Sequence, residues 1–101
     1  GLGFEYLQST FYTETERVGT IARMDERRAT WARTLGAHER AHVAILKKVL
    51  GRKAIKKPSF NFGGVTETVE AFTRTAVAII IPASRAAVSA YQRPPKTRTA
   101  P

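Results

Sequence analysis

The chain has 101 residues, with 17 lysines and arginines against 8 aspartates and glutamates, and a formal net charge of +9. This length fits one small domain with a thin core, so we expect an oligomer or a partner segment to add to its stability. Because the chain has no cysteine, a disulfide framework, a thiol nucleophile and any Cys-ligated metal site are excluded.

The first expected element is a helix from Leu2 to Val18. Its apolar residues follow steps of three, four and seven, which places them on one helix face: Phe4, Leu7, Phe11 and Val18. Gly19 follows the last of them and is expected to end the helix.

The second expected helix has the clearest periodicity in the chain. Its stripe follows alternating steps of four and three: Trp31, Leu35, His38, His42, Ile45 and Val49. Asp25 is the candidate N-cap, Lys47 and Lys48 suit the last turn, and Gly51 closes the helix. A length of about 25 residues is typical of the long helices found in bundles.

A loop over residues 52–64 should carry Phe60 and Phe62 back onto the end of the bundle. A third helix is expected to begin near Thr66, with its core stripe at steps of three and four: Val69, Phe72, Ala76 and Ile79. Pro82 should kink or break this helix, because proline removes a backbone donor and clashes with the preceding turn. Residues 83–92 can continue as a short helical segment.

These elements predict an all-α domain over residues 1–92, followed by a disordered basic and proline-rich tail over residues 93–101. The first two helices should form an antiparallel hairpin, with the third packed across it. The residues expected to be mostly buried in the hairpin are Phe4, Leu7, Phe11, Trp31, Leu35, Ile45 and Val49.

Two histidines and a carboxylate interrupt the apolar stripe of the second helix. His38 and His42 lie four residues apart and Glu39 lies three before His42, so all three fall within about one turn. An ionisable group on a core-facing stripe costs free energy unless it is paired or ligates a metal. Spacing alone leaves two interpretations open, namely neutral core histidines bonded to carbonyls and a metal site.

The first helix offers a second carboxylate at the same height. Glu5 lies about 13 residues before the end of its helix and Glu39 about 13 after the start of the next, so each is roughly 20 Å from the connection. Tyr12 lies two turns after Glu5 on the same face. One observation counts against a meeting of Glu5 and Glu39. On the helix wheel, Glu5 is offset by about 100° from Phe4, so it flanks the apolar stripe.

Three segments carry a family resemblance: EYLQSTFY, HERAH and KPSFNFGG. In order and spacing, over roughly residues 4–75, they resemble the ferritin-like domain proteins of the bacterial and desiccation-related type. The resemblance implies a four-helix bundle with two metal ions, held by a Glu from each of two helices and a Glu-x-x-His from each of the others. It places metal ligands at Glu5, Glu39 and His42, and a site-lining tyrosine at Tyr12. His38 lies one turn earlier and would either contact these ligands or be an alternative ligand.

The second half of the family pattern is missing. The family carries a Glu shortly before a Val-x-Ala-Tyr run, and here that run is kept at residues 88–91 while Ser84 stands in place of the Glu. No acidic residue follows Glu70, and no fourth helix with a second Glu-x-x-His is present in the sequence. The resemblance therefore implies an incomplete ferritin-like helical bundle, of three helices plus a short C-terminal helical segment, with half of a di-metal carboxylate site.

Three functions stay open. The favoured one is a metal-binding or structural protein, either inactive or binding a single ion of iron or another divalent metal, with no ferroxidase activity as an isolated chain. The second is a di-iron ferroxidase whose site is completed by a homodimer. Self-association is also expected because a missing fourth helix would leave an apolar groove.

The third function is binding of nucleic acid by a basic helical protein. The cations gather at residues 47–57 and 93–98, but no aromatic side chains alternate with them and no helix-turn-helix spacing is present, so this function is not favoured. The longest apolar run, residues 76–83, is too short to span a bilayer. We expect a soluble protein and leave the compartment open between the cytoplasm and export with loss of a targeting segment.

Overall fold

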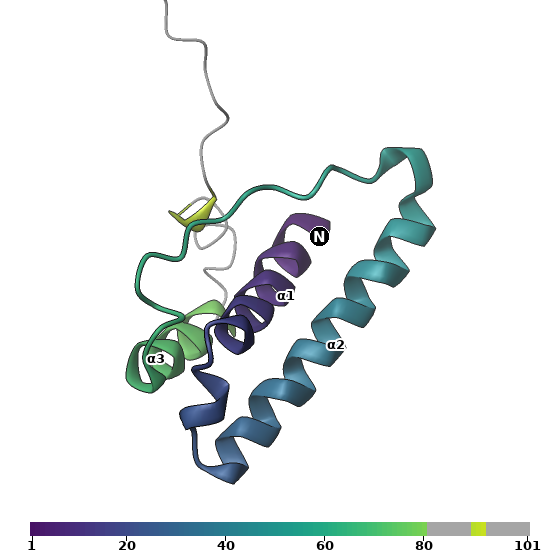
Figure 1. Cartoon of the computed structure of the whole chain (residues 1–101). Helices are drawn as coiled ribbons and strands as arrows, with labels where there is room; N and C mark the ends of the chain where they lie inside the picture. Colours follow the sequence, from purple (N-terminus) through teal and green to yellow (C-terminus); the bar gives the residue numbers. More distant parts are fainter. Residues whose placement is uncertain (81–89, 93–101) are drawn as a thin grey trace, which may run out of the picture.

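A computed structural model describes residues 1–80 and 90–92, except for the side chain of Ile80 (Figure 1). It contains helices α1 (Leu2–Arg17), α2 (Glu26–Leu50) and α3 (Val69–Ile80), with short 3₁₀ turns at Ile21–Arg23 and Gly51–Lys53. Helices α1 and α2 run antiparallel side by side, and α3 lies on the other side of α1 (Figure 1). The prediction of an all-α chain is confirmed.

The ends of α1 and α2 follow from local chemistry. Gly19 adopts φ 84°, a backbone conformation that favours glycine, and it ends α1 next to Val18. The Asp25 side chain accepts a hydrogen bond of 2.8 Å from the backbone N–H of Arg28 and thereby caps α2. Gly51, with φ 53°, closes α2 as expected. Both helices agree with the sequence prediction to within a residue or two.

Replacing Asp25 with alanine should lower the free energy of unfolding by about 1 kcal/mol, because the cap bond to Arg28 is lost. Urea unfolding followed by circular dichroism measures the change. The matched control is Glu26→Ala, which removes the same charge from the first turn of α2 but no cap bond, and should cost less than about 0.5 kcal/mol. Equal effects of the two substitutions would show that charge, and not capping, fixes the start of α2.

The core lies between α1, α3 and the loop that joins α2 to α3. Phe11 is fully buried at its centre, with its ring stacked on Phe72 at a centroid distance of 5.0 Å and tilted against Phe62 at 5.6 Å. The predicted stripe of α3 is confirmed at Phe72, Ala76 and Ile79, which are all buried. The loop aromatics fold back as expected, since Phe62 is buried and Phe60 packs against the same cluster.

The predicted start of α3 near Thr66 is wrong by about one turn. Residues 63–67 form turns, and the Thr68 side chain accepts a hydrogen bond of 3.1 Å from the N–H of Ala71, which caps a helix that begins at Val69. Thr66 is instead buried, and its carbonyl accepts a hydrogen bond from the Thr20 hydroxyl at 2.6 Å.

The predicted burial of Ile45 and Val49 is also wrong. These side chains are 58% and 75% exposed, and Trp31 is 41% exposed although its ring lies edge-on against Tyr12. Helix α1 packs on a neighbouring stripe of α2 formed by the small buried residues Ala29, Ala32 and Gly36. Helix α2 is also longer than α1, with 25 residues against 16, so its C-terminal end extends past the start of α1.

Several predictions fall outside the described residues. These are the kink at Pro82, the substitution at Ser84, most of the segment 83–92 and the tail 93–101. Of that segment, Ala90 and Tyr91 are helical, and the Tyr91 carbonyl accepts a hydrogen bond of 2.9 Å from the N–H of Asn61. Within residues 1–80 and 90–92, no helix combines the length and apolar character needed to cross a membrane.

Candidate metal centre

Three ionisable side chains meet between α1 and α2. Glu5 comes from α1, whereas Glu39 and His42 come from successive turns of α2. The Nδ1 atom of His42 lies 3.4 Å from Oε2 of Glu5 and 3.6 Å from Oε2 of Glu39. One ligand atom from each residue lies within 4.8 Å of the other two. We call these residues the carboxylate–histidine group.

The close approach of the two helices brings this group together. At Gly36, a Cβ atom would lie 3.0 Å from Cβ of Tyr12, so any side chain there would push α1 away by a few tenths of an ångström. Glu39 follows Gly36 by three residues and therefore points to the same side of α2, toward α1. On the other flank of α2, the Arg40 guanidinium donates a hydrogen bond of 3.2 Å to the Thr13 hydroxyl on α1.

The burial of this group is uneven. The Glu5 and Glu39 side chains are only 20% and 13% exposed, whereas that of His42 is 55% exposed. Among the described residues, no donor forms a hydrogen bond with Oε2 of Glu5 or with Oε2 of Glu39, although both atoms are buried. Two such oxygens facing one another are costly unless a proton or a cation lies between them.

The titration of Glu39 reflects this cost. Burial, followed by the neighbouring Glu5 carboxylate, raises the pKa of Glu39 from 4.5 to about 7, although His42 acts in the opposite direction. The raised pKa means that Glu39 keeps its proton to higher pH than an ordinary carboxyl, and a metal ion has to displace that proton.

The two other predicted residues take different positions. Tyr12 is buried beside Gly36, and burial together with the Glu39 carboxylate raises the pKa of its phenol to about 12, so it stays protonated. His38 is exposed, and its ring centroid lies 6.5 Å from that of His42. Within one chain, His38 does not join the carboxylate–histidine group.

Two carboxylates and an imidazole are suitable ligands for Fe(II), Mn(II) or Zn(II). These residues fit such an ion, because a cation would compensate two buried carboxylate oxygens that have no hydrogen-bond donor among the described residues. The exposed side of His42 leaves room for further ligands from outside the helix pair.

Gly36 is the functional residue that the sequence analysis missed. Its signal is present in the chain as a run of small residues at steps of three and four, Ala29, Ala32 and Gly36. Such a run has little hydrophobicity, so a search for apolar periodicity passes over it.

Comparison with known proteins gives one match. A family model described as ferritin-like domain matches residues 1–94, which include all three helices and the whole carboxylate–histidine group. Neither the curated proteins nor the solved structures give a match to the chain.

Proposed function

Because the chain belongs to the ferritin-like domain family, we propose that it binds one divalent metal ion through Glu5, Glu39 and His42. The observation that carries the proposal is the pair of buried carboxylate oxygens without donors, which face one imidazole nitrogen. Iron is the ion that the family suggests, and Mn(II) and Zn(II) suit the same ligands. We further propose that the isolated chain has no ferroxidase turnover, because its sequence contains no carboxylates for a second half-site after Glu70.

Each residue has a distinct part in holding the ion. Glu39, held on α2 against α1, must lose its proton before it can ligate, and Glu5 approaches from the opposite helix. His42 is the exposed member and closes the group from the solvent side. Tyr12 keeps a protonated phenol next to the Glu39 charge. When bound, a divalent ion would supply a Lewis-acid charge with open coordination positions.

Titration of the purified protein with Mn(II), with free Mn(II) measured by electron paramagnetic resonance, tests this proposal. We expect saturation at about one ion per chain. Glu5→Gln removes one carboxylate while keeping the side-chain shape, and should weaken binding by roughly tenfold to a hundredfold.

Glu16→Gln is the matched control, because it makes the same charge change at an exposed position on α1. The control should bind Mn(II) as the wild type does. Equal affinities of the wild type and Glu5→Gln would rule out the site and leave Glu5 and Glu39 as inherited polar residues.

A further inference from the structure

Helix α2 carries a second stripe that α1 does not cover. It lies about 130° around α2 from the small-residue stripe, and we call it the outer stripe: Trp31, Leu35, His38, His42, Ile45 and Val49. Trp31, Ile45 and Val49 are among the most exposed large apolar side chains of the described residues. Steps of four and three are the pattern of helices that pack along their length.

The spacing of the residues in the outer stripe is the same from either end of the helix. Its steps are four, three, four, three and four, so its members lie symmetrically about position 40. Two copies of α2 in antiparallel contact, with a two-fold axis at that level, would pair Trp31 with Val49, Leu35 with Ile45 and His38 with His42. A two-fold interface requires this self-complementarity, because the same patch faces itself.

The charges of α2 favour this antiparallel pairing. Arg33, Arg40 and Lys47 lie on the opposite side of the helix from the outer stripe, so the stripe itself carries no lysine or arginine. The first turn holds Asp25 and Glu26 followed by Arg27 and Arg28, so its formal charges cancel, whereas the last turn is basic, with Lys47 and Lys48. Antiparallel copies keep the two basic ends apart and also oppose the helix dipoles favourably, whereas parallel copies would bring the two basic ends together.

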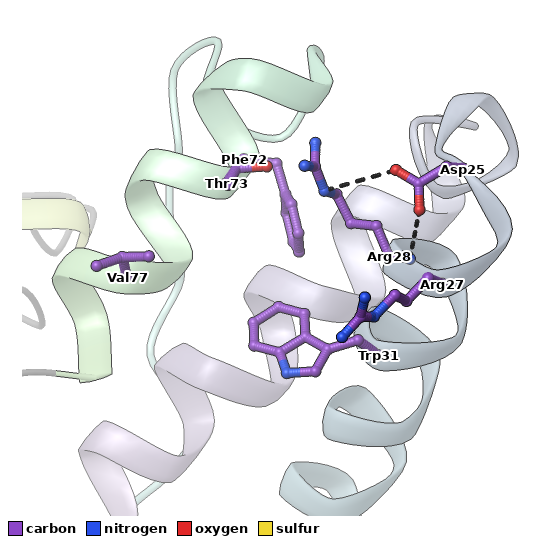
Figure 2. Close-up of a pocket in the computed structure, with 7 residues that line it drawn as sticks. All are labelled: Asp25, Arg27, Arg28, Trp31, Phe72, Thr73 and Val77. Carbon is purple, nitrogen blue, oxygen red and sulfur yellow. Dashed lines mark hydrogen bonds and ion pairs between the residues drawn. The ribbon is translucent and has the colours of Figure 1, made fainter.

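A groove beside Trp31 offers room for the second copy. Its volume is about 500 Å³, and it lies between the start of α2 and α3 (Figure 2). Trp31, Phe72 and Val77 supply its apolar walls, and Figure 2 shows the Trp31 and Phe72 rings extending into the space between the two helices. Trp31 is the residue that the symmetry pairs with Val49, whose side chain is the most exposed of the large apolar ones in residues 1–79 and 90–92.

We infer that two copies of this chain pack antiparallel along the outer stripe of α2, and that His38 of each copy faces the carboxylate–histidine group of the other. This inference rests on the proposed function, since His38 of the second copy would be a fourth protein ligand for the ion. His42 lies two residues from the centre, so the two groups would be about 6 Å apart along the helix axis. The second copy thus contributes the ligand that is missing on the exposed side of His42.

The metal ion should strengthen the dimer. The outer stripe spans 18 residue steps, about 27 Å of helix, which makes an interface at the small end of the range for stable dimers. An ion held by ligands from both copies binds the dimer more tightly than the monomer, so it shifts the equilibrium toward the dimer.

Analytical ultracentrifugation in Mn(II) and in EDTA tests the association. The wild type should be a dimer in saturating Mn(II), with a dimer dissociation constant at least roughly tenfold higher in EDTA. Ile45→Glu, at an exposed position, should give a folded monomer in both conditions. His38→Ala should lower the Mn(II) affinity roughly tenfold in the wild-type background and leave it unchanged in the Ile45→Glu monomer.

Cross-linking tests the register, and the absence of native cysteine makes it direct. Leu35→Cys and Ile45→Cys are made as separate chains, mixed in Mn(II) and treated with a short bis-maleimide. The mixture should give a covalent dimer and each variant alone should not, because like positions would lie about 15 Å apart along the axis. The matched control mixes Arg33→Cys with Lys47→Cys, which have the same symmetry but lie on the opposite face, and should give no product.

The outcomes separate the two proposals. A chain that binds about one Mn(II) and stays monomeric at all concentrations would overturn the dimer and leave the proposed function standing. A dimer with the expected cross-links but no Mn(II) binding would overturn the proposed function and the role of His38. Cross-linking of Leu35→Cys alone would overturn the antiparallel register, and a monomer whose stripe is covered by its own chain would give no cross-link in any mixture.

Discussion

Phe11→Ala is expected to lower the free energy of unfolding by about 3–5 kcal/mol, a large part of the stability of a domain of this size. Phe11 is fully buried, and its ring contacts those of Tyr12, Phe62 and Phe72, which come from α1, the loop and α3. Truncation therefore opens a cavity at the one point where all these segments meet. Urea unfolding followed by circular dichroism in EDTA measures the loss.

Val77→Ala is the control for this substitution. Val77 lies on α3 but is 60% exposed, so its truncation should change the free energy of unfolding by less than about 0.5 kcal/mol in EDTA. If Phe11→Ala cost no more than Val77→Ala, the aromatic cluster would not be the centre of the core.

The helix ends were predictable because their signals are local. Gly19, Asp25 and Gly51 act on backbone groups within a few residues of themselves, so no knowledge of the tertiary fold is needed to interpret them. Thr66 shows the limit of this approach. The third helix is expected from the sequence to begin near Thr66, but the Thr66 carbonyl is bound by Thr20 from a distant segment, and the cap is Thr68.

Which face of α2 is covered was not predictable from periodicity. A pattern shows which residues share a face, but the choice between two faces depends on the partner helix. Helix α1 packs on the small residues around Gly36, because their size allows close approach, and the more apolar outer stripe stays exposed. Thus hydrophobicity alone predicted burial for Ile45 and Val49, which are exposed.

The position of Glu5 has a similar explanation. Its offset from Phe4 counted against a site, on the assumption that α1 has one buried face. Helix α1 instead lies between α2 and α3, so it buries Phe11 toward α3 and Tyr12 toward α2. Glu5 shares the face of Tyr12, and that face meets α2 at the level of Glu39, as the height of the two carboxylates predicted.

Glu39→Gln should have opposite effects on metal binding and on the stability of the metal-free protein. Loss of the carboxylate should weaken Mn(II) binding by roughly a hundredfold, because Glu39 is the least exposed residue of the group. The same change removes a buried charge that faces Glu5, so in EDTA at pH 8 the variant should be more stable than the wild type by about 1 kcal/mol.

The pH dependence of the free energy of unfolding shows whether the Glu39 charge causes this difference in stability. Because the folded-state pKa of Glu39 is raised from 4.5 to about 7, the folded protein binds more protons than the unfolded chain between these values. The contribution of Glu39 is therefore a loss of stability as the pH rises from 4.5 to about 7, which is the reverse of the usual behaviour of a carboxylate. Glu39→Gln should remove this decline, and the two proteins should converge in stability below pH 4.5.

In Mn(II), the wild type should become more stable than Glu39→Gln at pH 8, which is the reverse of their order in EDTA. Ligation requires the charged carboxylate and neutral imidazole, so the wild type should gain stability from Mn(II) increasingly as the pH rises through 7, whereas Glu39→Gln should gain little. Urea unfolding from pH 4 to pH 8, with Mn(II) and with EDTA, measures all four curves. A wild type that is more stable than Glu39→Gln in EDTA at pH 8 would mean that a donor compensates the Glu39 charge in the metal-free protein. The two carboxylates would then be a structural pair, and a cation would not be needed to hold them together.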